Sequence, residues 1–351
     1  MSRSTPSRSE LIDLPLPTTG RSTYGADAHV VCDNVVRIYR SAGVEVVALQ
    51  GLDLLVDRGE LVAIIGPSGS GKSTLLRILS GLDVPTAGAV RVAGHDLATM
   101  GRRELLAYRR SVVGFVWQQT GRNLLPYLSA HENVALPLGI ARRSAREAAA
   151  RADELLELMG VASRGDQRPH QMSGGEQQRV AIAVAHRRDQ RPTEMSGGEQ
   201  QRVAIAVALA NSPEVLFADE PTGELDSATA ADVFAALRHA NSELGVTVVV
   251  VTHDALVSSQ VQRSISIRDG RTSTETLRRV DAPKDASGRV VAEEFAVLDR
   301  AGRLQLPAEF TTALDLRRRV RLELERDHIG VWPDAASADG THEGREVGNG
   351  A

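Results

Sequence analysis

The fold is decided by one short stretch, Gly66-Pro67-Ser68-Gly69-Ser70-Gly71-Lys72-Ser73-Thr74, which fits the pattern G-x-x-x-x-G-K-[ST]. It follows an apolar run at 61–65 and precedes helical apolar spacing at 73–82, the strand–loop–helix context that the pattern requires. The glycines let successive N–H groups face a phosphate, and the helix N-terminus adds partial positive charge. We expect a nucleoside triphosphate here, with Lys72 at its β- and γ-phosphates and the Ser73 hydroxyl on Mg²⁺. A glycine-rich turn without a ligand is the alternative, which the flanking elements disfavour.

The composition limits the function classes. Of the 351 residues 41 are basic, and all of these are arginines except Lys72 and Lys284. A lysine in a chain that otherwise uses arginine indicates a site that needs a compact point charge. The net charge is −4, so no global field favours nucleic acid as a partner. The single cysteine, Cys32, excludes an intramolecular disulfide and fits a reducing compartment. With no apolar run of roughly 18 residues and no secretory signal, we expect a cytoplasmic protein.

Short apolar runs alternate with helical stretches between the polar ends of the chain, which predicts an α/β fold. The run at 144–159 has the spacing of an amphipathic helix. Residues 215–218 and 247–251 have the composition of buried parallel strands. Between them, 227–244 is predicted to be a helix closed by Gly245.

Two adjacent carboxylates end one of these predicted strands, Leu216-Phe217-Ala218-Asp219-Glu220. Asp219 is placed to reach Mg²⁺ through water, and Glu220 to polarise the attacking water as a general base. An acidic end on an apolar strand is common in isolation. The pair becomes informative because a phosphate-binding loop is also present.

An internal repeat follows the amphipathic helix. The fourteen residues Met172–Ala185, MSGGEQQRVAIAVA, recur unchanged at Met195–Ala208. The period is 23, which defines two units at 166–188 and 189–211. Two copies are too few for a solenoid, so a local tandem duplication is the better interpretation. Each copy sets a hydroxyl and two glycine amides at a predicted helix N-terminus, a second anion site that a single-site hydrolase does not need.

With this second anion site, the chain resembles the nucleotide-binding domain of ABC transporters over roughly 30–275. Its signature is of the LSGGQ type, with Met195 in place of the usual Leu. The resemblance implies that Tyr39 stacks on adenine, and that Gln118 ligates Mg²⁺ and senses the membrane partner. It also implies that Asp226 belongs to the D-loop and that His253 lies near the γ-phosphate.

The resemblance implies a full set of site residues and a fold class. Catalytic roles fall to Glu220, His253 and Lys72, and ATP contacts to Tyr39, 66–74 and Gln118. The metal contacts are Ser73, Gln118 and Asp219. The signature, which acts in trans, is Ser196, Gly197, Gly198, Glu199 and Gln200. The expected fold class is α/β, a P-loop NTPase core with a helical subdomain, plus a small C-terminal β-rich hairpin domain.

The resemblance also implies the partners. Two copies face each other head to tail, and each ATP lies between the P-loop of one chain and the signature of the other. Residues 123–128, 132–138 and 218–223 are similar to the macrolide-export, lipoprotein-release and cell-division branch. The expected protein is a homodimeric exporter ATPase, peripheral at the inner face of the cell membrane, with a separate permease. A non-transport ABC ATPase that signals to a membrane or DNA partner is the alternative, and a degenerate ATP-binding scaffold is a third.

The duplication leaves two candidate signatures. Ser196 precedes Asp219 by 23 residues, which leaves room for a helix, a turn and a strand. Ser173 precedes Asp219 by 46 residues, so its use would require a loop of repeat length before the core strand. The first copy does lie at a natural distance from the helix that ends near 159. We expect Ser196 to be used, because the strand is the more rigid anchor.

The C-terminal part, 297–333, is predicted to form strand, turn, strand, short helix and further strands. It resembles the swapped-hairpin domain of AbrB-type regulators, which fold as interlocked dimers, although 317–319 is Arg-Arg-Arg where that family has Gly-Asp. Residues 317–321 could contact phosphates, or the segment could dimerise the ATPase, which we favour. The expected domains are polar tails at 1–29 and 335–351, the ATPase domain at 30–276, a linker at 277–296 and the hairpin domain at 297–334.

Overall fold

The computed structural model describes the chain in ten segments. They are residues 24–41, 44–119, 123–161, 195–223, 225–254, 260–280, 290–299, 302–316, 320–326 and 328–333. The first signature copy, at 172–185, lies outside the described residues, as do most of the N-terminal tail and all of the C-terminal tail.

A seven-stranded sheet forms the centre of the molecule, in the order β11-β10-β9-β3-β8-β7-β6. The five strands from β9 to β6 run parallel. Their bounds are Leu61–Ile65 for β3, Val113–Val116 for β6, Val215–Asp219 for β7, Thr247–Thr252 for β8 and Arg263–Arg268 for β9. β7 and β8 are buried at every position, as expected for parallel strands covered on both faces. The two strands predicted at 215–218 and 247–251 are therefore confirmed.

A second, four-stranded antiparallel sheet has the order β2-β1-β4-β5. Its strands are Val30–Ser41, Val44–Val56, Ala87–Val92 and His95–Asp96 for β1, β2, β4 and β5. Helix α1, Lys72–Leu79, contributes Leu75 and Leu79 to one apolar cluster with side chains of both sheets. Cys32 is fully buried in this cluster. The helix that follows the glycine-rich loop is thus held between two sheets, which fixes its N-terminus.

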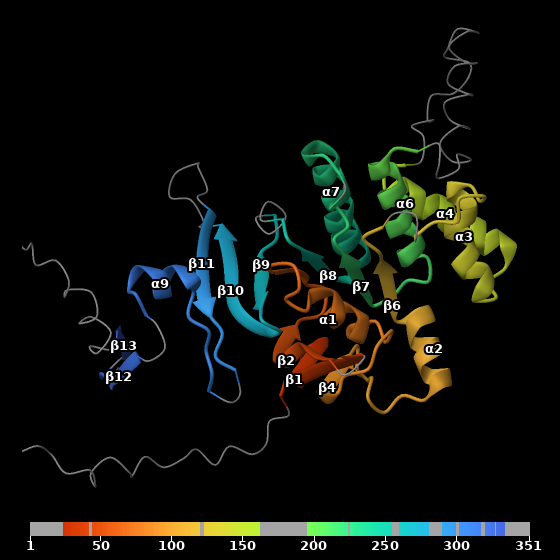
Figure 1. Ribbon diagram of the computed structural model, residues 1–351. Coiled ribbons are helices and arrows are strands. Elements are labelled where there is room, and N and C mark those ends of the chain that lie inside the picture. The colour runs from red at the N-terminus through yellow and green to blue at the C-terminus, as the bar shows by residue number, and fades with distance from the viewer. Residues whose placement is uncertain are drawn as a thin grey trace, which may run out of the picture.

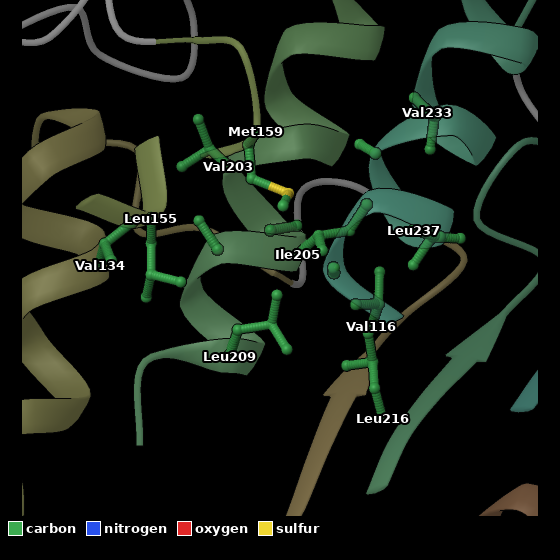
Figure 2. Close-up of a cluster of buried hydrophobic side chains, with 14 of the residues drawn as sticks. Val116, Val134, Leu155, Met159, Val203, Ile205, Leu209, Leu216, Val233 and Leu237 are labelled. Carbon is green, nitrogen blue, oxygen red and sulfur yellow. The ribbon is translucent and has the colours of Figure 1, made fainter. Parts of the chain in front are cut away.

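A layer of helices carries the other main core. Helices α3, α4, α6 and α7 span Ala130–Ile140, Ala145–Leu158, Gly197–Leu209 and Ser227–Leu244. Figure 1 shows them grouped away from β1, β2 and β4. Leu155 and Met159 pack with Val203 and Leu209 of α6 (Figure 2). The helices predicted at 144–159 and 227–244 are confirmed, and Gly245 closes α7 with a left-handed φ of 65°.

The linker predicted at 277–296 is wrong for much of its length. Strand β10, Arg271–Val280, pairs antiparallel with β9, and β11, Val290–Ala296, pairs with β10. Thr272, Thr274 and Thr276 explain the difference, because β-branched threonines favour a strand although they are polar. The central sheet therefore continues past the expected end of the ATPase domain.

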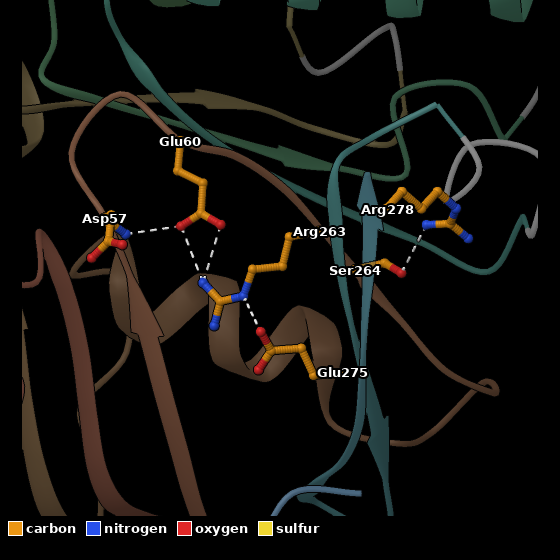
Figure 3. A network of polar contacts seen from close by, with 6 residues as sticks. All are labelled: Asp57, Glu60, Arg263, Ser264, Glu275 and Arg278. Carbon is orange, nitrogen blue, oxygen red and sulfur yellow. Dashed lines mark hydrogen bonds and ion pairs between the residues drawn. The ribbon is translucent and has the colours of Figure 1, made fainter. Parts of the chain in front are cut away.

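Arg263 joins this extension to the parallel strands (Figure 3). Its Nε lies 2.6 Å from Glu275 of β10, and its Nη1 lies 3.1 Å from both carboxylate oxygens of Glu60, just before β3. Glu60 also accepts a hydrogen bond of 2.9 Å from the backbone N–H of Asp57. One guanidinium on β9 thus joins β10 to the residues just before β3, about 200 positions earlier in the sequence.

Replacement of this arginine should destabilise the fold. Arg263→Met should lower the free energy of unfolding by about 2–3 kcal/mol, because it leaves two partly buried carboxylates without their cation. Urea unfolding of the full chain would measure the loss. Arg58→Met is a matched control, since Arg58 pairs with Glu214 at the surface with 72% of its side chain exposed; it should cost below about 1 kcal/mol. Equal losses would contradict the prediction.

The C-terminal segment begins on the cassette and ends in a separate hairpin. The backbone N–H of Val297 donates to Ser273 O at 2.9 Å, and Arg268 donates to Leu306 O at 3.0 Å. Helix α9 spans Ala308–Ala313, and β12, Val320–Leu324, pairs antiparallel with β13, Ile329–Pro333. Many large apolar side chains are exposed here, among them Leu298, Phe310, Leu314, Leu322, Leu324, Ile329 and Trp332.

Candidate functional site

The glycine-rich loop leaves β3 and enters α1 between two backbone segments. A Cβ on Gly66 would lie 2.2 Å from Ile267 O, and one on Gly71 would lie 2.4 Å from Ala48 O. Gly71 also has a left-handed φ of 99°. Because no larger residue fits at either position, the loop is held close against β2 and β9. The backbone N–H of Gly270, in the β9–β10 turn, also donates to Ser70 O at 3.2 Å.

The loop encloses polar groups that suit a phosphate. Lys72 is 5% exposed, and its ammonium donates to Gly66 O at 2.8 Å and to Pro67 O at 2.9 Å. Burial lowers the pKa of Lys72, while the nearby charges of Glu220 and Asp219 oppose this shift. The hydroxyl of Ser70 is buried and has no hydrogen-bond partner within the described part of the chain. These groups fit the oxygens of a triphosphate.

Ser73 and Asp219 meet at the base of the loop. The Ser73 hydroxyl donates to the Asp219 carboxylate at 3.1 Å, and Asp219 is 9% exposed. The pKa of Asp219 is raised, mainly by burial and also by the charge of Glu220. The hydrogen bond from Ser73 and the charge of Lys72 oppose this shift. The predicted pairing of these two oxygen donors is present, and it would suit a hard divalent cation.

Three residues predicted from separate motifs meet at one carboxylate oxygen. Glu220 Oε2 lies 3.0 Å from His253 Nδ1 and 3.2 Å from Gln118 Nε2. Glu220 has a left-handed φ of 45°, and its backbone N–H donates to Val251 O at 2.8 Å. A non-glycine residue in this conformation is strained, and such strain is concentrated at functional sites. The turn after β7 thus directs Glu220 toward Gln118 and His253.

The tyrosine predicted to stack on adenine is held by two residues that no motif predicts. The Tyr39 hydroxyl donates to Asp83 at 2.7 Å, and the Arg37 guanidinium lies 4.6 Å from the centre of the ring. Arg37 also pairs with Asp83 at 2.7 Å. Side chains alternate between the two faces of a strand, so Arg37 and Tyr39 lie on the same face. This spacing could have predicted from the sequence that Arg37 lies beside Tyr39. Asp83 lies after α1, and no sequence pattern links it to Tyr39.

Asn123 is another residue outside the predicted set. Its side-chain oxygen accepts from the Trp117 N–H at 2.8 Å, and its amide donates to Trp117 O at 2.8 Å. Trp117 immediately precedes Gln118. Asn123 therefore fixes the backbone from which Gln118 reaches Glu220.

The second signature copy is part of the helical core. Ser196 caps α6, and the Glu199 carboxylate accepts from the Ser196 N–H at 3.0 Å. Gln200 donates to Met195 O at 2.9 Å. Gly198 is buried, and a Cβ there would lie 2.2 Å from Thr229, whereas Gly197 is exposed.

Asp226, predicted in the D-loop, caps α7. Its carboxylate accepts from the backbone N–H groups of Ala228 and Thr229 and from the Thr229 hydroxyl at 2.6 Å. The hydrogen bond from the Thr229 side chain lowers the pKa of Asp226. The position therefore has a structural role that is independent of any contact with a second chain.

The buried charge of Asp219 should cost stability in the absence of nucleotide. Asp219→Asn should raise the melting temperature by about 2–4 °C at neutral pH, or ~1 kcal/mol. The folded-state pKa of Asp219 lies above its usual value. Ionisation therefore penalises the folded state above that pKa, and the penalty disappears as the pH falls through it. Thermal melts across a pH series should show the advantage of asparagine shrinking in acid; an advantage independent of pH would contradict this.

A family model supports these motifs. The model, described as ABC transporter, matches residues 49–191 and 184–223. The two matched segments overlap, and each contains one copy of the repeated signature, 172–185 in the first and 195–208 in the second. Both copies of the signature therefore lie within residues that the family model matches.

Individual relatives and solved structures lead to the same family as this match. The chain is 44% identical over 241 residues to the lipoprotein-releasing system ATP-binding protein LolD 2 of Caulobacter vibrioides, covering 69% of this chain and 95% of that protein. It is 43% identical over 254 residues to the macrolide export ATP-binding/permease protein MacB of Rhodopseudomonas palustris, covering 70% and 35%. A dimeric post-hydrolysis structure of the ATP-binding cassette MJ0796 with ADP and Pi aligns with a TM-score of 0.58 at 39% identity, covering 70% and 97%. The expected P-loop NTPase fold is thereby confirmed, and the chain belongs to the ABC transporter family as one of its ATP-binding cassettes.

Proposed function

We propose that this chain is the ATP-hydrolysing subunit of an exporter complex, and that its closure as a dimer drives a separate membrane permease. The convergence of Gln118 and His253 on the Glu220 carboxylate carries the proposal. These three residues follow neighbouring parallel strands: Gln118 follows β6, Glu220 follows β7 and His253 follows β8. Parallel strands present their carboxyl ends at one edge of the sheet, where α/β proteins bind their ligands.

The chemistry follows from the residues of this edge. The backbone of 66–74 and the Lys72 ammonium would bind the phosphates, and Tyr39 would stack on adenine. Mg²⁺ bound by Ser73, Asp219 and Gln118 would neutralise charge on the β- and γ-phosphates. Glu220 would accept a proton from the attacking water, and His253, 3.0 Å from that carboxylate, would hold it in place.

Dimerisation would complete the site. Ser196, Gly197, Gly198, Glu199 and Gln200 would bind the ATP held by the P-loop of a second copy, with Asp226 at the same interface. The exposed apolar side chains of 297–334 support a second contact between copies, formed by the hairpin of β12 and β13. Such a contact would raise the effective concentration of one cassette near the other. Differential binding of ATP to the closed dimer would then supply the work.

The partner is proposed from the relatives. The names of LolD 2 and MacB describe lipoprotein release and macrolide export, and MacB is named as both ATP-binding protein and permease. None of the helices in the described segments is long and apolar enough to cross a membrane. We propose that a permease chain supplies the spans and that this subunit lies at the inner face of the membrane.

Reconstitution tests the proposal. The purified full chain should hydrolyse ATP in the presence of Mg²⁺, and it should co-purify with a multi-span permease when the proteins of its own cell membrane are extracted in mild detergent. If the chain hydrolysed ATP but no permease co-purified with it, a non-transport ABC ATPase would be favoured. The absence of hydrolysis would favour a scaffold that only binds ATP.

A further inference from the structure

One face of helix α2, Arg102–Ser111, concentrates positive charge. Its residues Arg102, Arg103, Arg109 and Arg110 are all exposed. At about 100° per residue they lie within an arc of roughly 120°. Within the part of the chain that the structure describes, none of these four side chains has an ion pair with a carboxylate. The face is therefore a patch of uncompensated charge on a protein whose net charge is −4.

One apolar side chain lies within this arginine face. Leu106 points out between the arginines with 55% of its surface exposed. Arginines interleaved with exposed aliphatic groups are typical of helices that lie in a membrane interface.

The helix is fixed with this face outward. Tyr108, on the opposite side of α2, is 1% exposed, and its hydroxyl donates to Leu79 O at the end of α1. In the same C-terminal turn of α2, the side chain of Asn211 donates to Arg110 O at 3.0 Å. The arginine face is thus a preformed surface, and a partner would not have to order the backbone that carries it.

The same helix leads directly to the catalytic edge. Strand β6 begins two residues after α2, and Gln118 follows β6. The backbone N–H groups of Glu214 and Val215, at the start of β7, donate to Val112 O at 2.9 and 3.2 Å. A partner bound on α2 would therefore be joined through two adjacent strands to Gln118 and Glu220.

We propose that the arginine face of α2, with Leu106, lies against anionic lipid headgroups and orients the cassette on the membrane. This proposal rests on the membrane function proposed above. Guanidinium groups bind phosphate oxygens in a bidentate manner, which suits phospholipids. The Leu106 side chain among them suits the boundary between headgroups and acyl chains, whereas an acidic protein segment would leave it exposed to water.

Vesicle binding tests the proposal. The full chain should bind phosphatidylcholine vesicles that contain one-third phosphatidylglycerol much more tightly than pure phosphatidylcholine vesicles, and high salt should abolish the difference. Since each arginine near an anionic leaflet contributes about fivefold in affinity, the quadruple change Arg102→Gln, Arg103→Gln, Arg109→Gln and Arg110→Gln should lose at least about a hundredfold. Leu106→Ser should weaken binding to a smaller extent without changing its salt dependence.

A matched control removes the same charge elsewhere. Arg40, Arg58, Arg238 and Arg321 are exposed and lie on other elements, so their joint replacement by Gln should leave vesicle binding within about threefold. Equal loss in both variants, or no preference of the wild-type chain for anionic vesicles, would overturn the proposal. Unchanged vesicle binding with loss of permease co-purification would also overturn it, in favour of a protein contact. Hydrolysis of ATP in solution should be unchanged in the α2 variant, so failure of the ATPase itself would be recognised separately.

Discussion

Glu220→Gln should lower the rate of ATP hydrolysis by about 10²–10⁴-fold and leave ATP binding almost unchanged. The substitution removes the group proposed to accept the proton, and a general base contributes an effect of about this size. Glutamine keeps the shape of the side chain and can still contact Gln118 and His253, which lie 3.2 and 3.0 Å from the Glu220 carboxylate. Steady-state phosphate release and nucleotide binding would be measured on the same preparation.

The same variant should accumulate as an ATP-bound dimer if, as we propose, ATP closes the dimer and hydrolysis opens it again. Glu214→Gln is the matched control, since Glu214 lies just before β7, at the opposite end of the same strand, and pairs with Arg58 at the surface. It should leave the hydrolysis rate within about twofold. If Glu220→Gln retained more than a tenth of the wild-type rate, Glu220 would not be the general base.

Gly197→Asp should lower ATP hydrolysis by about 10²–10³-fold, the usual effect of losing a preorganised contact to developing charge. The new carboxylate would stand at the N-terminus of α6 and repel the phosphate presented by the second copy. Gly197 suits this test because it is exposed, and a Cβ there would meet only the end of the Leu225 side chain at 3.0 Å. Gly198 does not suit it, since its contact with Thr229 would confound folding with catalysis.

Gly174→Asp supplies the control inside the same chain. Gly174 occupies the same position in the first copy, within an identical run of fourteen residues. We expect it to leave hydrolysis within about twofold, well below the loss expected at a working anion site. Deletion of 166–188, which restores a single copy, should retain or raise the activity. If only Gly174→Asp abolished hydrolysis, the first copy would be the working signature.

The layers of the fold could be predicted because burial leaves a clear mark on sequence. The strands at 215–218 and 247–251 are apolar at nearly every position, and the helix at 144–159 has one apolar face. Thr247–Thr252 and Val215–Asp219 are buried throughout. Periodicity and burial therefore agree where the chain packs on both sides.

Strands β10 and β11 could not be predicted in this way. Their residues include many Thr, Arg and Glu, and their stability comes from pairing with β9 and from Arg263, neither of which is visible along the chain. The pairing of Arg37 and Tyr39 with Asp83 depends on contacts 44 to 46 positions away. Long-range partners of this kind carry no local periodicity, so a sequence pattern does not reveal them.

The residues of the candidate site could be predicted from sequence patterns more readily than the residues that hold them in place. Short motifs contain the glycine-rich loop, the carboxylate pair, Gln118 and His253. The structure brings Glu220, Gln118 and His253 together. Asn123, which holds the backbone of Trp117, belongs to no catalytic motif. The chemistry demands particular residues at fixed spacings, whereas a residue that positions a loop needs only to reach it.

The continuation of the central sheet through Val290–Ala296 has a practical meaning for dissecting the protein. A truncation at residue 276, where the motifs place the end of the cassette, would cut β10 in the middle, remove β11 and leave the shortened β10 as an open edge. Open edges recruit other strands and promote aggregation. A truncation after residue 296 would keep the full length of β10 and its pairing with β11, so the minimal cassette that can be isolated extends about twenty residues beyond the one that motifs define.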